Sequence, residues 1–299
     1  VMNPLDTLKR RGVLGTASYA ARVAVQRLGW YEFRFRNVPR YQSPTVDDLS
    51  RIENELLYLG INVDDFNADF DAFRAFHDEG FFPSDYHGGV DSGVWDEKLL
   101  EHFIASQLLG LKNFNRNDVY VDIAACNSPW AHALRSRFQV NAYAIDLEPG
   151  ETYQELPYYL QENATSTSFA NASVKGASLQ CAFEMFMRED DVEFIAEAGR
   201  VLAPGGKLVI LPLYMHTHYC AYSTPEYWGK GFSDAHAREY VRMDCYGVPS
   251  SRKYDAAMLK QRVIDSLLKH GMRYRLLALR NKEQLGSGIY CHFILEITR

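Results

Sequence analysis

After residue 117 the chain alternates short apolar runs with helical segments, and this alternation constrains the fold more than any other feature. Strands are predicted at 119–123, 141–145, 177–183, 207–213, 274–280 and 289–298, with helices at 130–138, 190–201 and 255–270. Strands that are joined through helices form right-handed units of a parallel sheet. No helix separates the last two strands, so they must pair antiparallel. The pattern therefore predicts an α/β, doubly wound, mostly parallel sheet that ends in an antiparallel C-terminal hairpin.

The first 95 residues lack this alternation and are expected to form a helical N-terminal extension. Helices are predicted at 16–28, 47–57 and 64–77, and the last of these carries a stripe of phenylalanines that favours a core position. Residues 96–299 are expected to form the main domain. Within that domain, residues 214–253 are expected to form an irregular polar insertion.

Charge is distributed unevenly along the chain. Residues 1–41 hold eight basic and two acidic side chains, whereas residues 42–101 hold three basic and fifteen acidic ones. The basic arm either packs against the acidic segment beside it or contacts a membrane surface or an anionic glycolipid. The formal charge of the whole chain is -6, which argues against general binding of nucleic acid.

Composition excludes several other classes of protein. With 47% hydrophobic and 23% charged residues, the 299-residue chain is neither disordered nor fibrous. Its five cysteines are scattered without a CxxC motif, so we expect free thiols in a reducing, cytoplasmic setting. No apolar run of about 18 residues is present that would predict a transmembrane helix. The sequence does not indicate an oligomeric state.

Small residues and two acidic residues follow the first two strands of the predicted sheet. The first strand runs through Asp122 into a turn of small side chains, and the second strand ends at Asp146, 24 residues later. Ligands of open α/β sheets bind beyond the carboxyl ends of the strands. A carboxylate at Asp146 could accept hydrogen bonds from both hydroxyls of a ribose. Its alternative role is to cap a helix N-terminus.

The chain at this point resembles the class I S-adenosylmethionine-dependent methyltransferases, over about residues 95–299. The resemblance depends on the Asp122 turn, on Asp146, on Asn163-Ala164, on the run RVLAPGGKLVI at 200–210 and on the closing hairpin. It implies a Rossmann-like fold of seven strands and S-adenosylmethionine as cofactor. The cofactor-binding residues it implies are Tyr86, His87, Asp122, Ala124, Ala125, Cys126, Ser128, Asp146, Leu147, Asn163, Ala164 and Cys181.

The turn after the first strand departs from the glycine-rich motif of that family. Ala124, Cys126 and Ser128 occupy the positions where the family usually has glycine. A pyrophosphate cofactor needs glycines because its phosphates lie against the backbone, whereas S-adenosylmethionine has no phosphate. The substitution therefore argues against NAD more strongly than against S-adenosylmethionine. Ahead of this turn, Tyr86 and His87 are expected to cover the methionine half of the cofactor, although His87 could equally lie in an ordinary surface loop.

Three side chains are candidates for a catalytic base. Glu184 follows the strand at 177–183, where related enzymes place acceptor-facing residues, although it could instead cap a helix. His216 and His218 follow the strand at 207–213 and could act as bases or form a plain pocket wall. Cys220 continues their alternation, but no fourth ligand is evident, so no metal site is expected.

Together these features predict methyl transfer, most readily O-methylation of a saccharide or other small polar acceptor. The tyrosines and Trp228 of 214–228, with nearby arginines, suit a glycan because aromatic faces pack on sugar CH groups. Two alternatives are open. One is a non-catalytic binding or scaffolding protein that keeps a decayed methyltransferase fold, and the other is a nicotinamide-dependent oxidoreductase.

Overall fold

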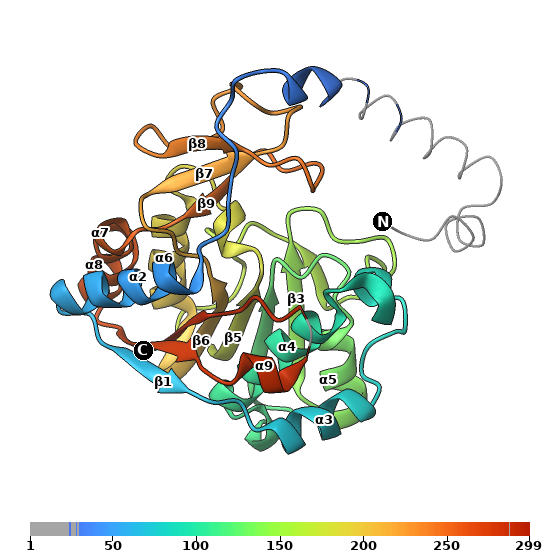
Figure 1. Cartoon of the computed structure of the whole chain (residues 1–299). Helices are drawn as coiled ribbons and strands as arrows, with labels where there is room; N and C mark the ends of the chain where they lie inside the picture. The colour runs from blue at the N-terminus through green and yellow to red at the C-terminus, as the bar shows by residue number, and fades with distance from the viewer. Residues whose placement is uncertain (1–23, 25–27, 29, 287) are drawn as a thin grey trace.

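The computed structural model describes residues 24, 28, 30–286 and 288–299, and its centre is one eight-stranded sheet in the order β1-β10-β11-β6-β5-β2-β3-β4 (Figure 1). The strands are β1 (Val63–Phe66), β2 (Val119–Ile123), β3 (Asn141–Asp146), β4 (Tyr159–Gln161), β5 (Val174–Gln180), β6 (Leu202–Leu213), β10 (Arg273–Leu279) and β11 (Phe293–Thr298). Neighbours pair parallel except for β11, which is antiparallel to both β10 and β6. The Rossmann-like α/β fold and its antiparallel C-terminal strands are confirmed.

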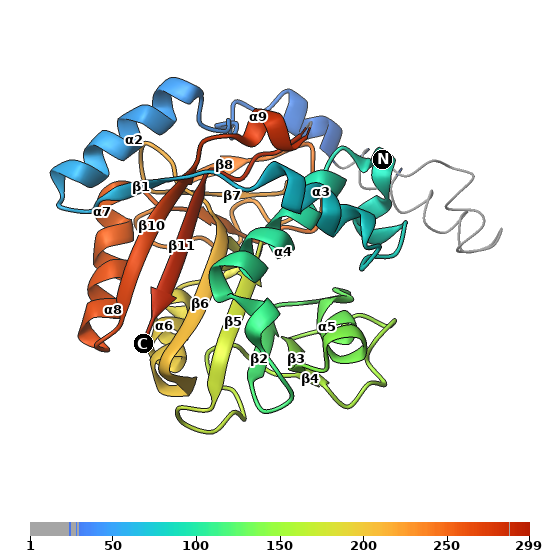
Figure 2. The same cartoon turned by 90° about the horizontal axis from the view of Figure 1, so that it is seen from below.

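Both faces of this sheet are buried under helices, so successive strand residues enter two different cores. Tyr120 packs on one side of β2 and Val121 on the other, as the period of two requires. One face is covered by α2 (Val46–Tyr58), α6 (Asp190–Val201), α7 (Ala256–Met258), a π-helical turn (Leu259–Ile264) and α8 (Asp265–Lys269). The other face is covered by α3 (Phe70–Asp78), α4 (Trp95–Leu109), α5 (Trp130–Phe138) and α9 (Lys282–Leu285) (Figure 2).

The N-terminal region supplies helices, as expected, and also the eighth strand, which was not predicted. Residues 63–66 form β1 along β10, and α3 starts only after Asp69, whose side chain accepts a hydrogen bond from the Ala72 amide. The single helix predicted over 64–77 is therefore wrong in its first turn. The boundary at residue 95 stays a prediction, as does the +6 arm at 1–41, most of which lies outside the described residues together with the helix predicted at 16–28.

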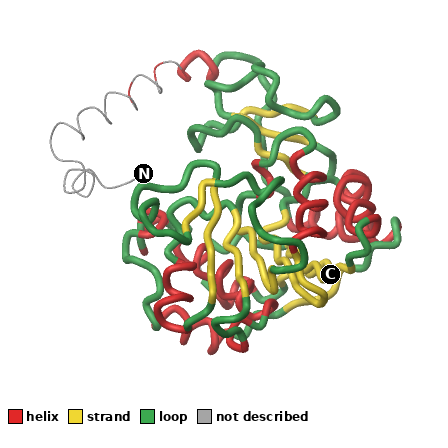
Figure 3. Tube along the Cα trace, turned by 180° about the vertical axis from the view of Figure 1, so that it is seen from behind, coloured by secondary structure: helices red, strands yellow, loops and turns green. Residues whose placement is uncertain are grey.

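The polar insertion is more regular than its composition suggested. Strands β7 (Cys220–Ser223), β8 (Arg238–Val241) and β9 (Ser251–Lys253) form a second sheet in the order β8-β7-β9, above the main sheet (Figure 3). The N-terminal segment lies along its edge, where the Tyr41 amide donates to the Val241 carbonyl and the Val241 amide to Pro39. Trp30 stacks on Tyr246 at 4.4 Å between ring centroids. Within the described part of the chain, no helix is long and apolar enough to cross a membrane.

Candidate functional site

Two hollows meet at Ala124, beyond the carboxyl ends of β2, β3 and β5. The first, the β3-side hollow, has about 670 Å³ of space open to solvent and is lined by Ala124, Ile145, Asp146, Leu147, Glu162, Asn163, Ala164, Thr165, Ala182, Met185, Phe186, Met187 and Asp190. The second, the α4-side hollow, has about 750 Å³ and is lined by Tyr86, His87, Lys98, Glu101, His102, Asp122, Ala124, Ala125, Cys126, Ser128, Gln180, Cys181 and Tyr290. Every residue that the sequence pointed to as cofactor-binding lines one of the two.

Asp146 lies at the end of β3, where its carboxylate fixes the backbone of the neighbouring turn. Oδ2 accepts a hydrogen bond of 2.8 Å from the Cys126 amide, and Oδ1 accepts one of 2.9 Å from the Glu148 amide. No described helix begins at Asp146, so the capping alternative does not apply. Each oxygen keeps a further lone pair that can face the hollow.

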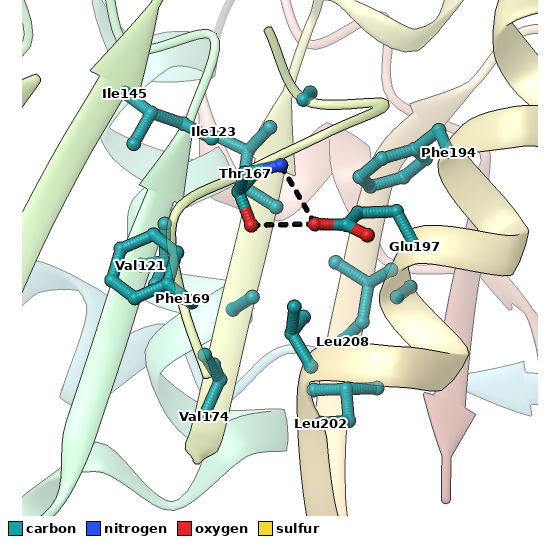
Figure 4. A pocket seen from close by; sticks show the side chains of 14 residues that line it. Val121, Ile123, Ile145, Thr167, Phe169, Val174, Phe194, Glu197, Leu202 and Leu208 are labelled. Carbon is teal, nitrogen blue, oxygen red and sulfur yellow. Dashed lines mark hydrogen bonds between the residues drawn. The ribbon is translucent and has the colours of Figure 1, made fainter. Parts of the chain in front are cut away.

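Side chains of α6 hold the loop that carries Asn163 and Ala164 through hydrogen bonds. Glu197 accepts hydrogen bonds from the Thr167 amide and hydroxyl, at 2.7 and 2.6 Å, as Figure 4 shows. The Arg200 guanidinium donates to the carbonyls of Thr167 and Phe169 at 3.0 and 2.8 Å. Below the loop, Thr167 and Phe169 line a small, mainly apolar pocket together with residues of the sheet and of α6. Arg200 of the RVLAPGG run thus positions this loop and lines neither hollow.

The α4-side hollow contains buried charges. Asp122 is 1% exposed, accepts a hydrogen bond of 2.8 Å from the Ser128 hydroxyl, and has its pKa raised to about 7 by burial. Lys98 of α4 donates to both carboxylate oxygens of Glu101, at 2.8 and 3.1 Å. Burial opposes the Lys98 ammonium, but the Glu101 carboxylate outweighs it and raises the pKa of Lys98 well above its ordinary value. The hollow therefore offers a fixed cation beside carboxyl groups.

A polar pair from the loop and α4 closes the other side of this hollow. His102 is 2% exposed, and its Nε2 lies 3.1 Å from the Tyr86 hydroxyl. Burial lowers the pKa of His102 to about 3, so the imidazole is neutral at physiological pH. The segment of Tyr86 and His87 is thus held against α4 and forms a wall of the hollow.

The backbone of the glycine-poor turn has the left-handed conformation that glycine usually supplies. Ala124 and Cys126 have φ values of 55° and 47°, in the left-handed region that favours glycine. His87 and Cys181, which line the same hollow, have φ values of 49° each. Left-handed residues with a Cβ cost about 1–2 kcal/mol each, and such strain concentrates at ligand sites.

Residues 121–210 match a family described as "Methyltransferase domain". They form a methyltransferase domain. The family predicted from the sequence is thereby confirmed for this segment, and S-adenosylmethionine is accordingly the cofactor. No curated protein matches the sequence.

Solved structures similar to this chain include other methyltransferases at low identity. The *Burkholderia thailandensis* 1,6-didemethyltoxoflavin-N1-methyltransferase is 17% identical, with a TM-score of 0.42, covering 79% of this chain and 92% of that one. The *Streptomyces coelicolor* geranyl diphosphate C-methyltransferase is 13% identical, with a TM-score of 0.37, covering 76% and 95%. A chain from the complex of the *Haloferax volcanii* Trm112 methyltransferase activator with a methyltransferase is 16% identical, with a TM-score of 0.40, covering 78% and 98%. Similarity at this level does not show which acceptor or partner this chain has.

The two hollows of the methyltransferase domain fit the cofactor chemically. Asp146 offers two acceptors for ribose hydroxyls, beside the apolar side chains of Leu147 and Phe186. The methionine half carries an ammonium, a carboxylate and a sulfonium, and the α4-side hollow presents the carboxyl groups of Asp122 and Glu101 beside the Lys98 ammonium. The charged groups of the methionine half would thus lie opposite side chains of the other sign. This half of the cofactor has no phosphate to bind.

Of the three candidate bases, only Glu184 lies next to these hollows. It lies within a 3₁₀ helix (Phe183–Met185) rather than at its cap, and its Oε1 accepts from the Sγ of Cys181 at 3.7 Å. His216 and His218 line neither hollow. They face the N-terminal segment and the second sheet instead, through the Gln42 carbonyl and the Tyr240 hydroxyl.

Several residues that line the α4-side hollow were not predicted. Lys98, Glu101 and His102 come from α4, a helix buried on nearly every side. A sequence signal was present, because charged residues in a helix without a continuous polar face indicate buried ionic contacts. Gln180 and Tyr290 left no such signal. Tyr290 reaches the hollow from the loop before β11, a contact created only by the closing hairpin.

Proposed function

We propose that this chain transfers the methyl group of S-adenosylmethionine to a hydroxyl of a small polar acceptor, such as a saccharide, and that Glu184 receives the hydroxyl proton. One observation carries the proposal. Glu184 is 8% exposed, and its Oε2 has no hydrogen-bond partner among the described residues. A buried carboxylate oxygen without a donor costs about 1–3 kcal/mol or more, which a bound hydroxyl would offset.

The surroundings of Glu184 suit a sugar. Cys181, which lines the α4-side hollow, has its Sγ 3.2 Å from the Tyr214 hydroxyl and 3.8 Å from that of Tyr290. The rings of Tyr214 and Tyr290 are stacked, with centroids 6.3 Å apart. Aromatic faces of this kind pack against the CH groups of a sugar ring. Lys253, buried 3.8 Å from the centre of the Tyr214 ring, adds a donor behind them.

Lys253 is a second ionisable group close to Glu184. Burial lowers the pKa of Lys253 to about 8, while the nearby Glu184 carboxylate acts in the opposite direction. At neutral pH most of the lysine is therefore charged, so it presents a cation beside Glu184. Because both groups are buried, their mutual attraction is little screened by salt.

These positions give the cofactor and the side chains separate roles in the proposed reaction. S-adenosylmethionine, when bound, supplies a methyl group on an already activated sulfonium. The chain's own residues hold the acceptor hydroxyl in line, exclude water and accept one proton at Glu184 Oε2. Asp146 fixes the ribose, and Lys98 with Glu101 fixes the methionine half.

The test combines an acceptor screen with one substitution. Wild-type chain is incubated with S-adenosylmethionine and a panel of saccharides, phenols and amines, and products are detected by the mass gain of one methyl group. With the best acceptor, Glu184→Gln should lower kcat by about 10²–10⁴-fold and leave S-adenosylhomocysteine binding unchanged. Glu148→Gln, an exposed glutamate near the ribose side, is the matched control.

Three outcomes contradict parts of the proposal. Methylation of amines alone would exclude the hydroxyl acceptor. Full activity of Glu184→Gln would exclude Glu184 as the base. The scaffolding alternative would be favoured if S-adenosylhomocysteine gave no thermal shift and no acceptor were methylated.

A further inference from the structure

His216, His218 and Cys220 gather on one side of the extended segment that leads into β7. One ring nitrogen of each histidine and the Sγ of Cys220 all lie within 4.8 Å of one another. The two rings are 4.3 Å apart between centroids. Residues at alternate positions of an extended chain share a face, which explains how three neighbours in sequence converge.

The outer contacts of both histidines leave a nitrogen available inside the cluster. His216 Nε2 lies 3.3 Å from the Gln42 carbonyl, which only accepts, so this nitrogen carries the hydrogen and Nδ1 carries the lone pair. His218 Nε2 lies 2.8 Å from the Tyr240 hydroxyl, which can accept in the same way. Each Nδ1 lies 3.3 Å from the single hydroxyl of Thr217, between the rings. Metal-binding histidines have this arrangement, with the outer N–H held by a carbonyl or other acceptor.

We propose that His216, His218 and Cys220 form a binding site for Zn²⁺. Two imidazoles and a thiolate are the donors that Zn²⁺ prefers, and a fourth position is left for water. In a tetrahedral site with bonds of about 2.0–2.3 Å, donors are separated by roughly 3.5 Å. Contraction from 4.8 Å needs small side-chain rotations. Binding converts the Cys220 thiol to a thiolate and releases its proton to the buffer.

The position of this site links separate parts of the chain. It joins three parts of the chain: the segment at Gln42, the residues entering β7, and β8 through Tyr240. None of the three ligands lines the β3-side or α4-side hollow. This proposal differs from the expectation that the chain has no metal site. That expectation was based only on the lack of a fourth protein ligand. Three-ligand sites with an open position are common for zinc.

The experiment uses the full chain without an affinity tag, stripped with chelator and then titrated with Zn²⁺ by calorimetry. We expect one equivalent to bind and to raise the melting temperature, with no such effect from Mg²⁺. Loading with Co²⁺ should give a thiolate-to-metal absorption band. His216→Ala, at a half-buried position, should weaken binding by more than about tenfold, since even outer-shell losses cost 10–100-fold.

His236→Ala and Cys245→Ser are the matched controls, because both residues lie in the same insertion and outside the cluster. S-adenosylhomocysteine binding by each variant shows that it is folded and keeps this test separate from the methyltransferase function. The proposal is overturned if Zn²⁺ does not bind, if His236→Ala loses as much affinity as His216→Ala, or if the Co²⁺ form lacks the thiolate band.

Discussion

Asp146→Asn should weaken binding of S-adenosylmethionine by about ten- to a hundredfold. The two oxygens of Asp146 accept one backbone amide each, from Cys126 and Glu148, and each keeps a lone pair for one ribose hydroxyl. Asparagine keeps only one acceptor, so one charge-assisted hydrogen bond of about 1.5–3 kcal/mol is lost. At 1.4 kcal/mol per factor of ten, that loss gives the stated range.

The same substitution should lower the stability of the cofactor-free protein by about 1–3 kcal/mol. The new amide group must face either the Cys126 or the Glu148 N–H, donor against donor, and one backbone amide loses its partner. Calorimetry with S-adenosylhomocysteine measures the first effect and denaturant unfolding the second. Glu148→Gln removes the same charge nearby and should change neither by much. Wild-type affinity in a folded Asp146→Asn variant would refute the assignment of the ribose to Asp146.

Three further predictions concern the backbone, the pH dependence and the loop. Ala124→Gly should stabilise the fold by up to about 1 kcal/mol in denaturant unfolding because φ is 55°, whereas Ala142→Gly in β3 should destabilise it. Burial raises the pKa of Asp122 to about 7, so the folded state favours its neutral form, and cofactor-free stability should fall as pH rises from about 4 to 7. A cationic cofactor favours the ionised form, so calorimetric affinity should rise over the upper part of this window and level off above it, and Asp122→Asn should remove that rise. Arg200→Ala should weaken cofactor binding several-fold by freeing the Thr167 loop, and unchanged affinity would contradict the positioning role.

The main sheet and the residues that line the two hollows beside Ala124 could be predicted because their signals are local. Strand 119–123 and the small residues after it occur in one continuous stretch, and so does the RVLAPGG run. A parallel sheet then brings the carboxyl ends of adjacent strands together whatever their separation in sequence. This is why Asp122 and Asp146 lie beside the two hollows that share Ala124.

The missed features depend on long-range contacts or on weak local patterns. Strand β1 has only four residues, and its two central aspartates face solvent at a sheet edge, so no hydrophobic alternation marks it. The short strands of the second sheet gain their partners across 17 to 32 intervening positions, as in the pairing of Cys220 with Lys253. His216 and His218 were candidate bases only because of their residue type and their place after a predicted strand. The fold directs them away from the hollows, toward Gln42 and Tyr240.

The electrostatics of the α4-side hollow suit a cationic cofactor despite the glycine-poor turn. Asp122 and Glu101 are buried there, and the Lys98 ammonium donates hydrogen bonds to both carboxylate oxygens of Glu101. A pyrophosphate brought to these carboxyl groups would meet like charge or force protons onto them, and the Cβ atoms of Ala124 and Cys126 occupy the positions where phosphate cofactors need bare backbone. A sulfonium and an ammonium meet opposite charge instead. Ala124 and Cys126 therefore disfavour a nicotinamide dinucleotide, and the carboxyl groups of Asp122 and Glu101 favour a cationic, phosphate-free cofactor.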